Sequence, residues 1–97
     1  MGASRRPQPK MLGRKLYLLR MGLNLTQQEM ADQLGQAPSP PRPADISRFE
    51  QGIREPSLPV LLTYARLAGV LVDTLVDDEL SLPLKLQRQG RPRRKRS

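Results

Sequence analysis

The chain has 97 residues, ten of them proline, and it contains neither cysteine nor histidine. This composition allows one modest domain and excludes disulfides, Cys/His metal sites and nucleophile–imidazole pairs. No apolar run approaches the roughly 18 residues that a membrane span needs. We therefore expect a cytoplasmic protein that is not an enzyme and that holds no metal or cofactor.

The net charge of +8 is concentrated at the two ends of the chain. Residues 1–15 carry five basic side chains and residues 84–97 carry seven, with no acidic residue in either segment. Residues 16–83 hold five arginines against nine acids, a net charge of −4. The basic ends favour contact with a polyanion such as a nucleic acid, or serve only for solubility and unspecific contact.

Apolar spacing predicts the first two helices. A first helix should run from Lys10 to about residue 24, because one face carries Leu12, Leu16 and Leu19. Thr26 and Glu29 form a capping box that begins a short second helix, and Gly35 should end it. The inward stripe of this helix is expected to be Met30, Ala31 and Leu34.

Three further helices are predicted. A third helix over residues 43–51 has Pro43 in its first turn, stops at Gly52, and should bury Ile46 and Phe49. Ser57 caps a fourth helix, whose expected inward residues are Leu61, Leu62, Ala65 and Ala68. Residues 72–76 form a short fifth helix that starts without a good cap.

The remaining segments are predicted to be non-helical. Leucines alternate with other residues from Leu80 to Leu86, which favours a strand restricted to an edge by Pro83. Such a strand could lie on its own domain or pair with the same strand of a second subunit. We expect the domain at 10–79, the strand at 80–86, and disordered basic segments at 1–9 and 87–97.

Five short helices with a tight connection between the second and the third are typical of a helix-turn-helix unit. The sequence resembles the phage-repressor and Cro type of helix-turn-helix protein, the xenobiotic-response-element family. The resemblance covers residues 11–78 and rests on Leu16, Leu19, Arg20, Thr26, Gln27, Ala31, Gly35, Ile46, Glu50, Gly52, Pro56, Ser57 and Leu75. It implies an all-α, five-helix lambda-repressor-like domain whose third helix enters the major groove of DNA.

The chain departs from this family in the turn before the third helix. Eleven positions separate Gly35 from Ile46, several more than in the family, and four prolines lie within residues 38–43. Proline fixes its own backbone and disfavours helix in the residue before it. We predict that the prolines keep a lengthened turn stiff; the alternative is a tolerated surface loop.

The resemblance also implies roles for individual residues. Base contacts are expected from the outward face of the third helix, at Pro43, Ala44, Ser47, Arg48 and Gln51. Arg48 would reach guanine O6 and N7, and Ala44 a thymine methyl group. Phosphate contacts are expected from Thr26, Gln27, Arg42 and Arg54. Arg20 and Glu50 should form an internal ion pair.

The C-terminal segment Gly90-Arg91-Pro92 resembles the core of an AT-hook, although Gln89 stands where that motif has its first arginine. An AT-hook lies along a narrow A·T minor groove, whose negative potential attracts arginine. We therefore predict minor-groove contacts from Arg91, Arg93 and Arg94.

These features together predict a sequence-specific DNA-binding transcriptional regulator. Its simplest form is a repressor in the cytoplasm, at the nucleoid, that binds a palindromic operator as a homodimer. Two alternatives remain: an antitoxin-type autoregulator that binds a protein partner, or a non-specific nucleic-acid-binding module that acts through its basic ends. The acidic cluster Asp73, Asp77, Asp78 and Glu79 is interpreted as a solvated helix end rather than a catalytic site.

Overall fold

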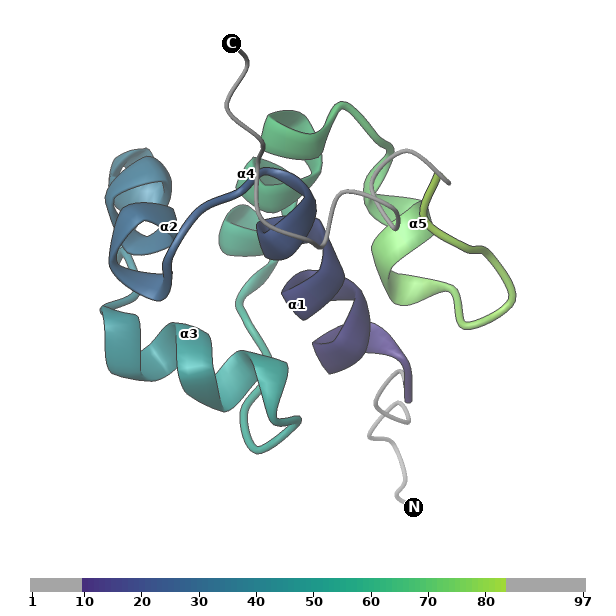
Figure 1. The fold of residues 1–97 in the computed structure, drawn as a ribbon, viewed down its shortest axis with the longest axis horizontal. Helices are drawn as coiled ribbons and strands as arrows, with labels where there is room; N and C mark the ends of the chain where they lie inside the picture. Colours follow the sequence, from purple (N-terminus) through teal and green to yellow (C-terminus); the bar gives the residue numbers. More distant parts are fainter. Residues whose placement is uncertain (1–9, 84–97) are drawn as a thin grey trace, which may run out of the picture.

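The computed structural model describes residues 10–83, and every regular element in that range is helical (Figure 1). The elements are α1 (Leu12–Gly22), α2 (Gln27–Gln33), the 3₁₀ turn η1 (Leu34–Gln36), α3 (Pro43–Glu50), α4 (Leu58–Ala68) and α5 (Val72–Val76). The predicted all-α fold with five helices is confirmed.

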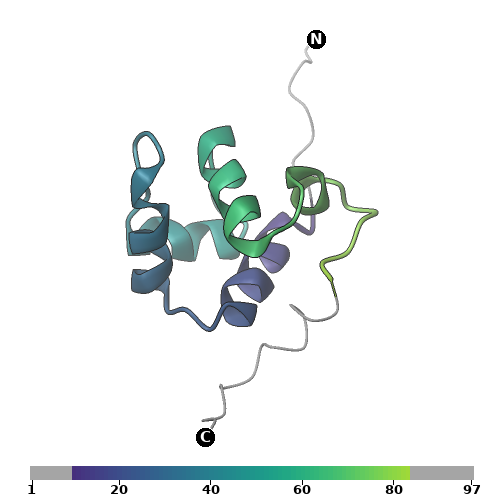
Figure 2. The same ribbon diagram turned by 90° about the horizontal axis from the view of Figure 1, so that it is seen from above.

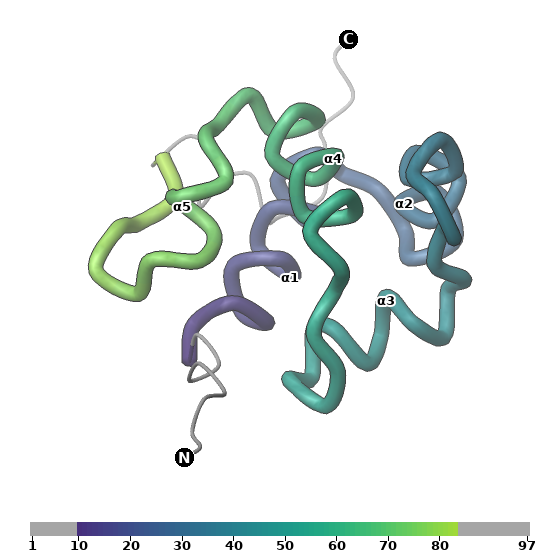
Figure 3. The backbone as a smooth tube through the Cα atoms, turned by 180° about the vertical axis from the view of Figure 1, so that it is seen from behind, coloured from purple at the N-terminus to yellow at the C-terminus, as the bar shows by residue number. Residues whose placement is uncertain are grey.

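Helix α1 lies in the middle of the fold, with α2 and α3 on one side and α5 on the other (Figures 1 and 2). It packs against α3 and α5, while α4 contacts α5 and η1. In the view from behind, α4 passes in front of α1 (Figure 3), and the buried residues of all five helices form one core.

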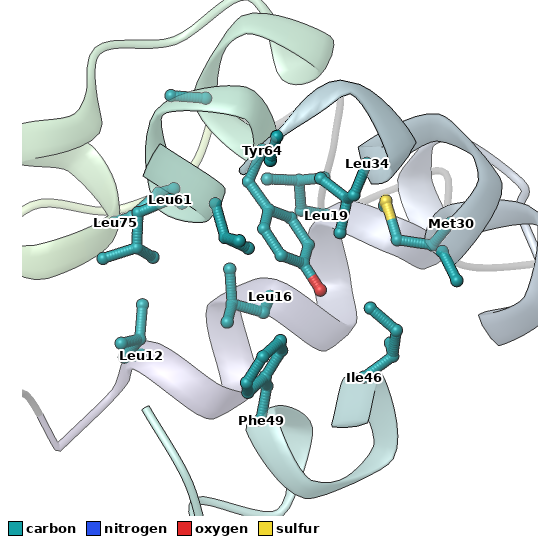
Figure 4. Packing of buried hydrophobic residues seen from close by; sticks show 14 of the residues in the cluster. Leu12, Leu16, Leu19, Met30, Leu34, Ile46, Phe49, Leu61, Tyr64 and Leu75 are labelled. Atoms are coloured by element: carbon teal, nitrogen blue, oxygen red, sulfur yellow. The ribbon is translucent and has the colours of Figure 1, made fainter. Parts of the chain in front are cut away.

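Every helix contributes side chains to the core (Figure 4). Its fully buried side chains are Leu16, Leu19, Met30, Leu34, Ile46, Tyr64 and Leu75. The predicted inward face of α4 was partly wrong, because Leu62 is 37% exposed whereas Val60 and Tyr64 are buried. The ring of Tyr64 is larger than a leucine side chain, so turning it inward buries more apolar area.

Two caps predicted from the sequence are formed. The Glu29 backbone N–H donates to Thr26 Oγ1 at 3.0 Å, and the Thr26 N–H donates to Glu29 Oε1 at 2.8 Å. Ser57 accepts from the Val60 N–H at the start of α4. These bonds satisfy backbone donors that a helix start otherwise leaves without an intrahelical acceptor.

The proline-rich turn is anchored at both of its ends. Gly35 does not end the helical path, because η1 continues it as far as Gln36. Ala37 then enters the core at 6% exposure, and Pro41 is also buried. Between them, Ser39 has a φ of +50°, a conformation uncommon for a residue other than glycine. Only the middle of the turn is therefore a surface loop.

The segment after α5 contributes one residue to the core of its own domain. No strand is formed over Leu80–Pro83, the described part of the predicted strand, and residues 84–86 lie outside the described range. Leu82 is buried at 4% exposure. The core therefore includes a residue beyond the boundary expected at 79, and Leu82 is not exposed for contact with a second subunit.

Lys15, which the sequence groups with the basic N-terminal end, is buried at 5% exposure. Its Nζ donates to the carbonyl oxygens of Thr74 at 2.8 Å and Asp77 at 2.7 Å. Burial lowers the pKa of the ammonium, although the negative charges of Asp78 and Asp77 oppose this. Lys15 thus links α1 to the C-terminal end of α5, where the helix dipole favours a cation.

Asp78 makes the reciprocal connection to the start of α1. Its carboxylate accepts the backbone N–H groups of Lys10 and Met11, each at 3.0 Å. These two hydrogen bonds are the main cause that lowers the pKa of Asp78. Part of the acidic cluster that resembled a solvated helix end is therefore a tertiary cap.

Gly13 allows a close approach between α1 and the end of α3. A Cβ atom at this position would lie 2.8 Å from the Glu50 carbonyl oxygen and 2.9 Å from that of Phe49. Real Cβ atoms essentially never approach backbone atoms so closely. The α1 backbone and the end of α3 are therefore in direct contact at this position.

Candidate nucleic-acid interface

Helices α2 and α3 form the helix-turn-helix pair on one side of the molecule, joined by the proline-rich turn (Figure 3). Pro43 occupies the first turn of α3, as predicted. Ahead of it, the carbonyl of Arg42 accepts the Asp45 and Ile46 N–H groups at 2.8 and 3.1 Å. The first turn of α3 is thereby closed without a Ser, Thr, Asp or Asn at the cap position.

The outward face of α3 carries the residues predicted to contact bases. Ala44, Arg48 and Gln51 are exposed, and Pro43 and Ser47 are half-buried. The helix turns Ile46 and Phe49 into the core. Across the outer face, Gln51 Nε2 donates to Ser47 Oγ at 2.7 Å. The structure thus brings all five predicted residues onto or beside one solvent-accessible helix face.

Asp45 joins two of the predicted DNA-contacting arginines. Its Oδ1 accepts from Arg48 Nη1 at 3.2 Å and from Arg54 Nη1 at 3.1 Å, and its Oδ2 accepts from the Arg42 backbone N–H at 3.0 Å. The backbone hydrogen bond is the main cause that lowers the Asp45 pKa, and the charges of Arg54, Arg42 and Arg48 add to it.

Sequence reasoning missed Asp45. The spacing of Asp45 and Arg48, three residues apart on a helix, was a usable signal for one of its bonds. The bond to Arg54 joins residues nine positions apart, across the end of α3. No helical periodicity predicts that contact.

The residues predicted to contact phosphate lie around the start of α2 and the two ends of α3. Arg42 and Arg54 are exposed, whereas Gln27 is half-buried. Gln27 Nε2 donates to Glu50 Oε1 at 3.3 Å. Thr26 is exposed and uses its hydroxyl oxygen as a cap acceptor, which leaves the hydroxyl hydrogen able to donate.

Arg20 and Glu50 form the predicted ion pair, and they do so bidentately. Arg20 Nε lies 2.6 Å from Glu50 Oε2, and Nη2 donates to Oε1 at 2.9 Å. The side chains are only 10% and 7% exposed. The hydrogen bond to Glu50 is the main cause that raises the pKa of Arg20, against the effect of burial.

The pair is also connected to its surroundings. Arg20 Nη1 donates to the Leu25 carbonyl at 2.9 Å, and the guanidinium carbon lies 5.6 Å from the centre of the Tyr17 ring. Because Gln27 reaches the same carboxylate, Glu50 on α3 is joined to both α1 and α2. This carboxylate fixes the relative positions of the three helices that build the interface.

The predicted minor-groove residues Arg91, Arg93 and Arg94, and the N-terminal segment 1–9, lie outside the described residues. Between residues 10 and 83, no three His, Cys, Asp or Glu side chains come together as potential metal ligands. None of the helices in this range is long and apolar enough to cross a membrane.

Comparison with known proteins finds the same fold in solved structures. The c2 repressor of phage P22, in a crystal structure with a synthetic operator, matches with a TM-score of 0.60 at 21% identity. The match covers 69% of this chain and 94% of the repressor chain. Neither a scan against protein-family models nor a search of curated protein sequences finds a match.

A second match is to a structure of the SinR protein in complex with the SinI protein. It has a TM-score of 0.59 at 24% identity and covers 71% of this chain and 63% of the matched chain. At these identities the comparison establishes the fold and not the function. The described chain is a helix-turn-helix domain with the fold of the P22 c2 repressor.

Proposed function

We propose that this chain is a sequence-specific DNA-binding transcriptional regulator, and that it acts as a repressor on a palindromic operator. The observation that carries the proposal is the outward face of α3. In a fold shared with a repressor that was crystallised with a synthetic operator, this face presents an exposed arginine and an exposed glutamine to solvent. It buries none of its polar side chains in the core.

The proposed base contacts follow from the chemistry of each exposed side chain. The guanidinium of Arg48 matches the two acceptors of guanine, O6 and N7, and the methyl group of Ala44 matches that of thymine. Gln51 and Ser47, already hydrogen-bonded to each other, offer an amide and a hydroxyl to base edges or to bridging water. Pro43 can add only apolar contact.

Phosphate contacts are proposed for four residues at the borders of this face: Thr26, Gln27, Arg42 and Arg54. The basic residues Arg91, Arg93 and Arg94 are proposed to add minor-groove or phosphate contacts that contain little sequence information. Since residues 16–83 have a net charge of −4, we expect the basic segments 1–15 and 84–97 to supply most of the non-specific attraction.

A single α3 reads only a few base pairs, so we propose a homodimer on two half-sites about one DNA turn, roughly 34 Å, apart. The buried Leu82 does not provide the dimer contact that the predicted strand suggested. Light scattering of the full-length protein, alone and with a palindromic duplex, measures the oligomeric state directly. We also propose a cytoplasmic location at the nucleoid and no catalytic activity.

Selection of binding sites from random duplex DNA tests the function. The experiment compares the full-length protein with Arg48→Ala and with Arg66→Ala, which removes the same charge from an exposed position on α4. We expect the wild type and Arg66→Ala to enrich one palindromic site, and Arg48→Ala to lose preference at one position in each half-site. If the wild type enriches no sequence, the proposal is wrong.

Two alternatives predict different results in that selection. A non-specific nucleic-acid-binding module would bind every duplex with strong salt dependence and enrich none. A regulator that also binds a protein partner would still enrich a site; the SinR chain, which shares this fold, was solved in complex with SinI and favours this second candidate.

A further inference from the structure

Asp45 occupies an unusual position for an acidic side chain in a surface proposed to approach DNA. It lies in the first turn of α3, where its Oδ2 accepts the Arg42 backbone N–H and so completes a cap. Its Oδ1 has a separate role, because it accepts from both Arg48 and Arg54. The Asp45 side chain is only 16% exposed, whereas the side chains of Arg48 and Arg54 are 51% and 60% exposed.

The bridge brings the two arginine side chains close together. Each Nη1 atom is within 3.2 Å of the same carboxylate oxygen, so the two atoms are at most twice that distance apart. Two guanidinium groups this close repel each other, and an anion between them offsets that repulsion by attracting both. An arginine side chain that is not held also has about 2 kcal/mol of rotamer entropy to lose when it binds. In the free protein, Asp45 reduces both the repulsion between the two arginines and the rotamer entropy that they lose on binding DNA.

We propose that Asp45 is a positioning residue that gives the interface part of its sequence specificity. It holds Arg48 at the base edges and Arg54 beside it, at the adjoining DNA backbone. This inference rests on the proposed DNA-binding function. The same negative charge is repelled by phosphates at every sequence, so Asp45 weakens binding uniformly while it improves discrimination. Affinity and specificity should therefore change in opposite directions when the charge is removed.

Glu29 supplies a matched control for this test. It occupies the equivalent capping position in α2, where its carboxylate accepts the Thr26 N–H. Glu29→Gln and Asp45→Asn each replace a capping carboxylate with an amide and raise the net charge by one. Within residues 10–83, the hydrogen bonds of Glu29 are to the Thr26 cap and not to an arginine.

The experiment measures binding of the full-length protein to its selected operator and to a scrambled duplex at several salt concentrations. Both variants should bind the scrambled duplex at least as tightly as the wild type. Only Asp45→Asn should lose specificity, with the operator-to-scrambled affinity ratio falling about tenfold. In an Arg48→Ala background, Asp45→Asn should lower the ratio no further, because its effect passes through Arg48.

The inference is overturned if Asp45→Asn keeps the wild-type ratio, or if Glu29→Gln lowers it equally. A wild type that selects no operator would instead contradict the proposed function. The bridge can also be tested without DNA, by following the Nε–H NMR signals of Arg48 and Arg54. Both signals should shift in Asp45→Asn and stay in place in Glu29→Gln; unchanged signals in Asp45→Asn would overturn the inference even where binding cannot be measured.

Discussion

The ion pair between Arg20 and Glu50 should be one of the most sensitive points in the domain. The Glu50 side chain is only 7% exposed in the wild type, and in Arg20→Met its carboxylate would keep Gln27, at 3.3 Å, as its only side-chain donor among the described residues. Leaving one member of a buried pair without its partner typically costs about 3–5 kcal/mol. Whole domains are stable by only about 5–15 kcal/mol, so the variant should be close to unfolding.

A double-mutant cycle gives this prediction its measurement. Urea unfolding, followed by circular dichroism, is compared for the wild type, Arg20→Met, Glu50→Gln and the double variant. The Leu25 carbonyl loses its guanidinium donor in both variants that lack Arg20, so that loss cancels in the cycle. We expect the double variant to be about 2 kcal/mol more stable than the sum of the single effects.

The midpoint of thermal unfolding offers a second reading of the same cost. For a domain of this size, each 1 kcal/mol shifts the midpoint by about 4–8 °C, so Arg20→Met should melt at least about 12 °C lower. If Arg20→Met costs less than about 1 kcal/mol, or if the two single effects simply add, the pair does not act as a buried charge pair. Glu50 would then not be the residue that holds the three helices together.

Three further predictions concern other parts of the chain. Alanine normally stabilises a helix relative to glycine by about 1 kcal/mol. Gly13→Ala should nevertheless lower the stability of the protein in urea unfolding, because its Cβ atom would meet the α3 backbone. Gly35→Ala should not, because its Cβ atom would meet nothing within 4 Å. The pKa of Asp78 is lowered in the folded protein. The stability that this carboxylate contributes is therefore present above its unfolded pKa of about 3.9 and is lost as the pH falls below that value. Asp78→Asn should flatten the decline in thermal stability measured from pH 5 to pH 2. Equal acid sensitivity of the two proteins would contradict this. Replacement of Arg91, Arg93 and Arg94 by glutamine should reduce the slope of log K against log salt by about 0.9 for each phosphate that the protein no longer neutralises. The selected operator should stay the same. An altered operator would show that these arginines read bases.

The helices were predictable because their signals are local. The capping box at Thr26 and the leucine spacing of α1 need no knowledge of the rest of the chain. The orientation of α4 was predicted less well, since Leu62 and Tyr64 are both plausible core residues and only packing decides between them. A helix face is set by the shape of the space that it fills, and that shape depends on the other helices.

The interface shows the same division between local and non-local information. The outward residues of α3 follow from helix geometry once Ile46 and Phe49 are assigned to the core. The burial of Lys15 could not be predicted, because its acceptors lie 59 and 62 residues away in the sequence. The bridge from Asp45 to Arg54 likewise depends on how the chain folds back after α3.

The Glu50 carboxylate on α3 is hydrogen-bonded to Arg20 on α1 and to Gln27 on α2. The angle between α2 and α3 therefore does not depend only on the length of the turn that connects them. Once a side chain far from the turn holds the pair together, residues can be added to the connection without realigning the helices. For protein engineering, this marks the apex at Ser39 and Pro40, between the buried Ala37 and Pro41, as a point where a foreign peptide can be grafted.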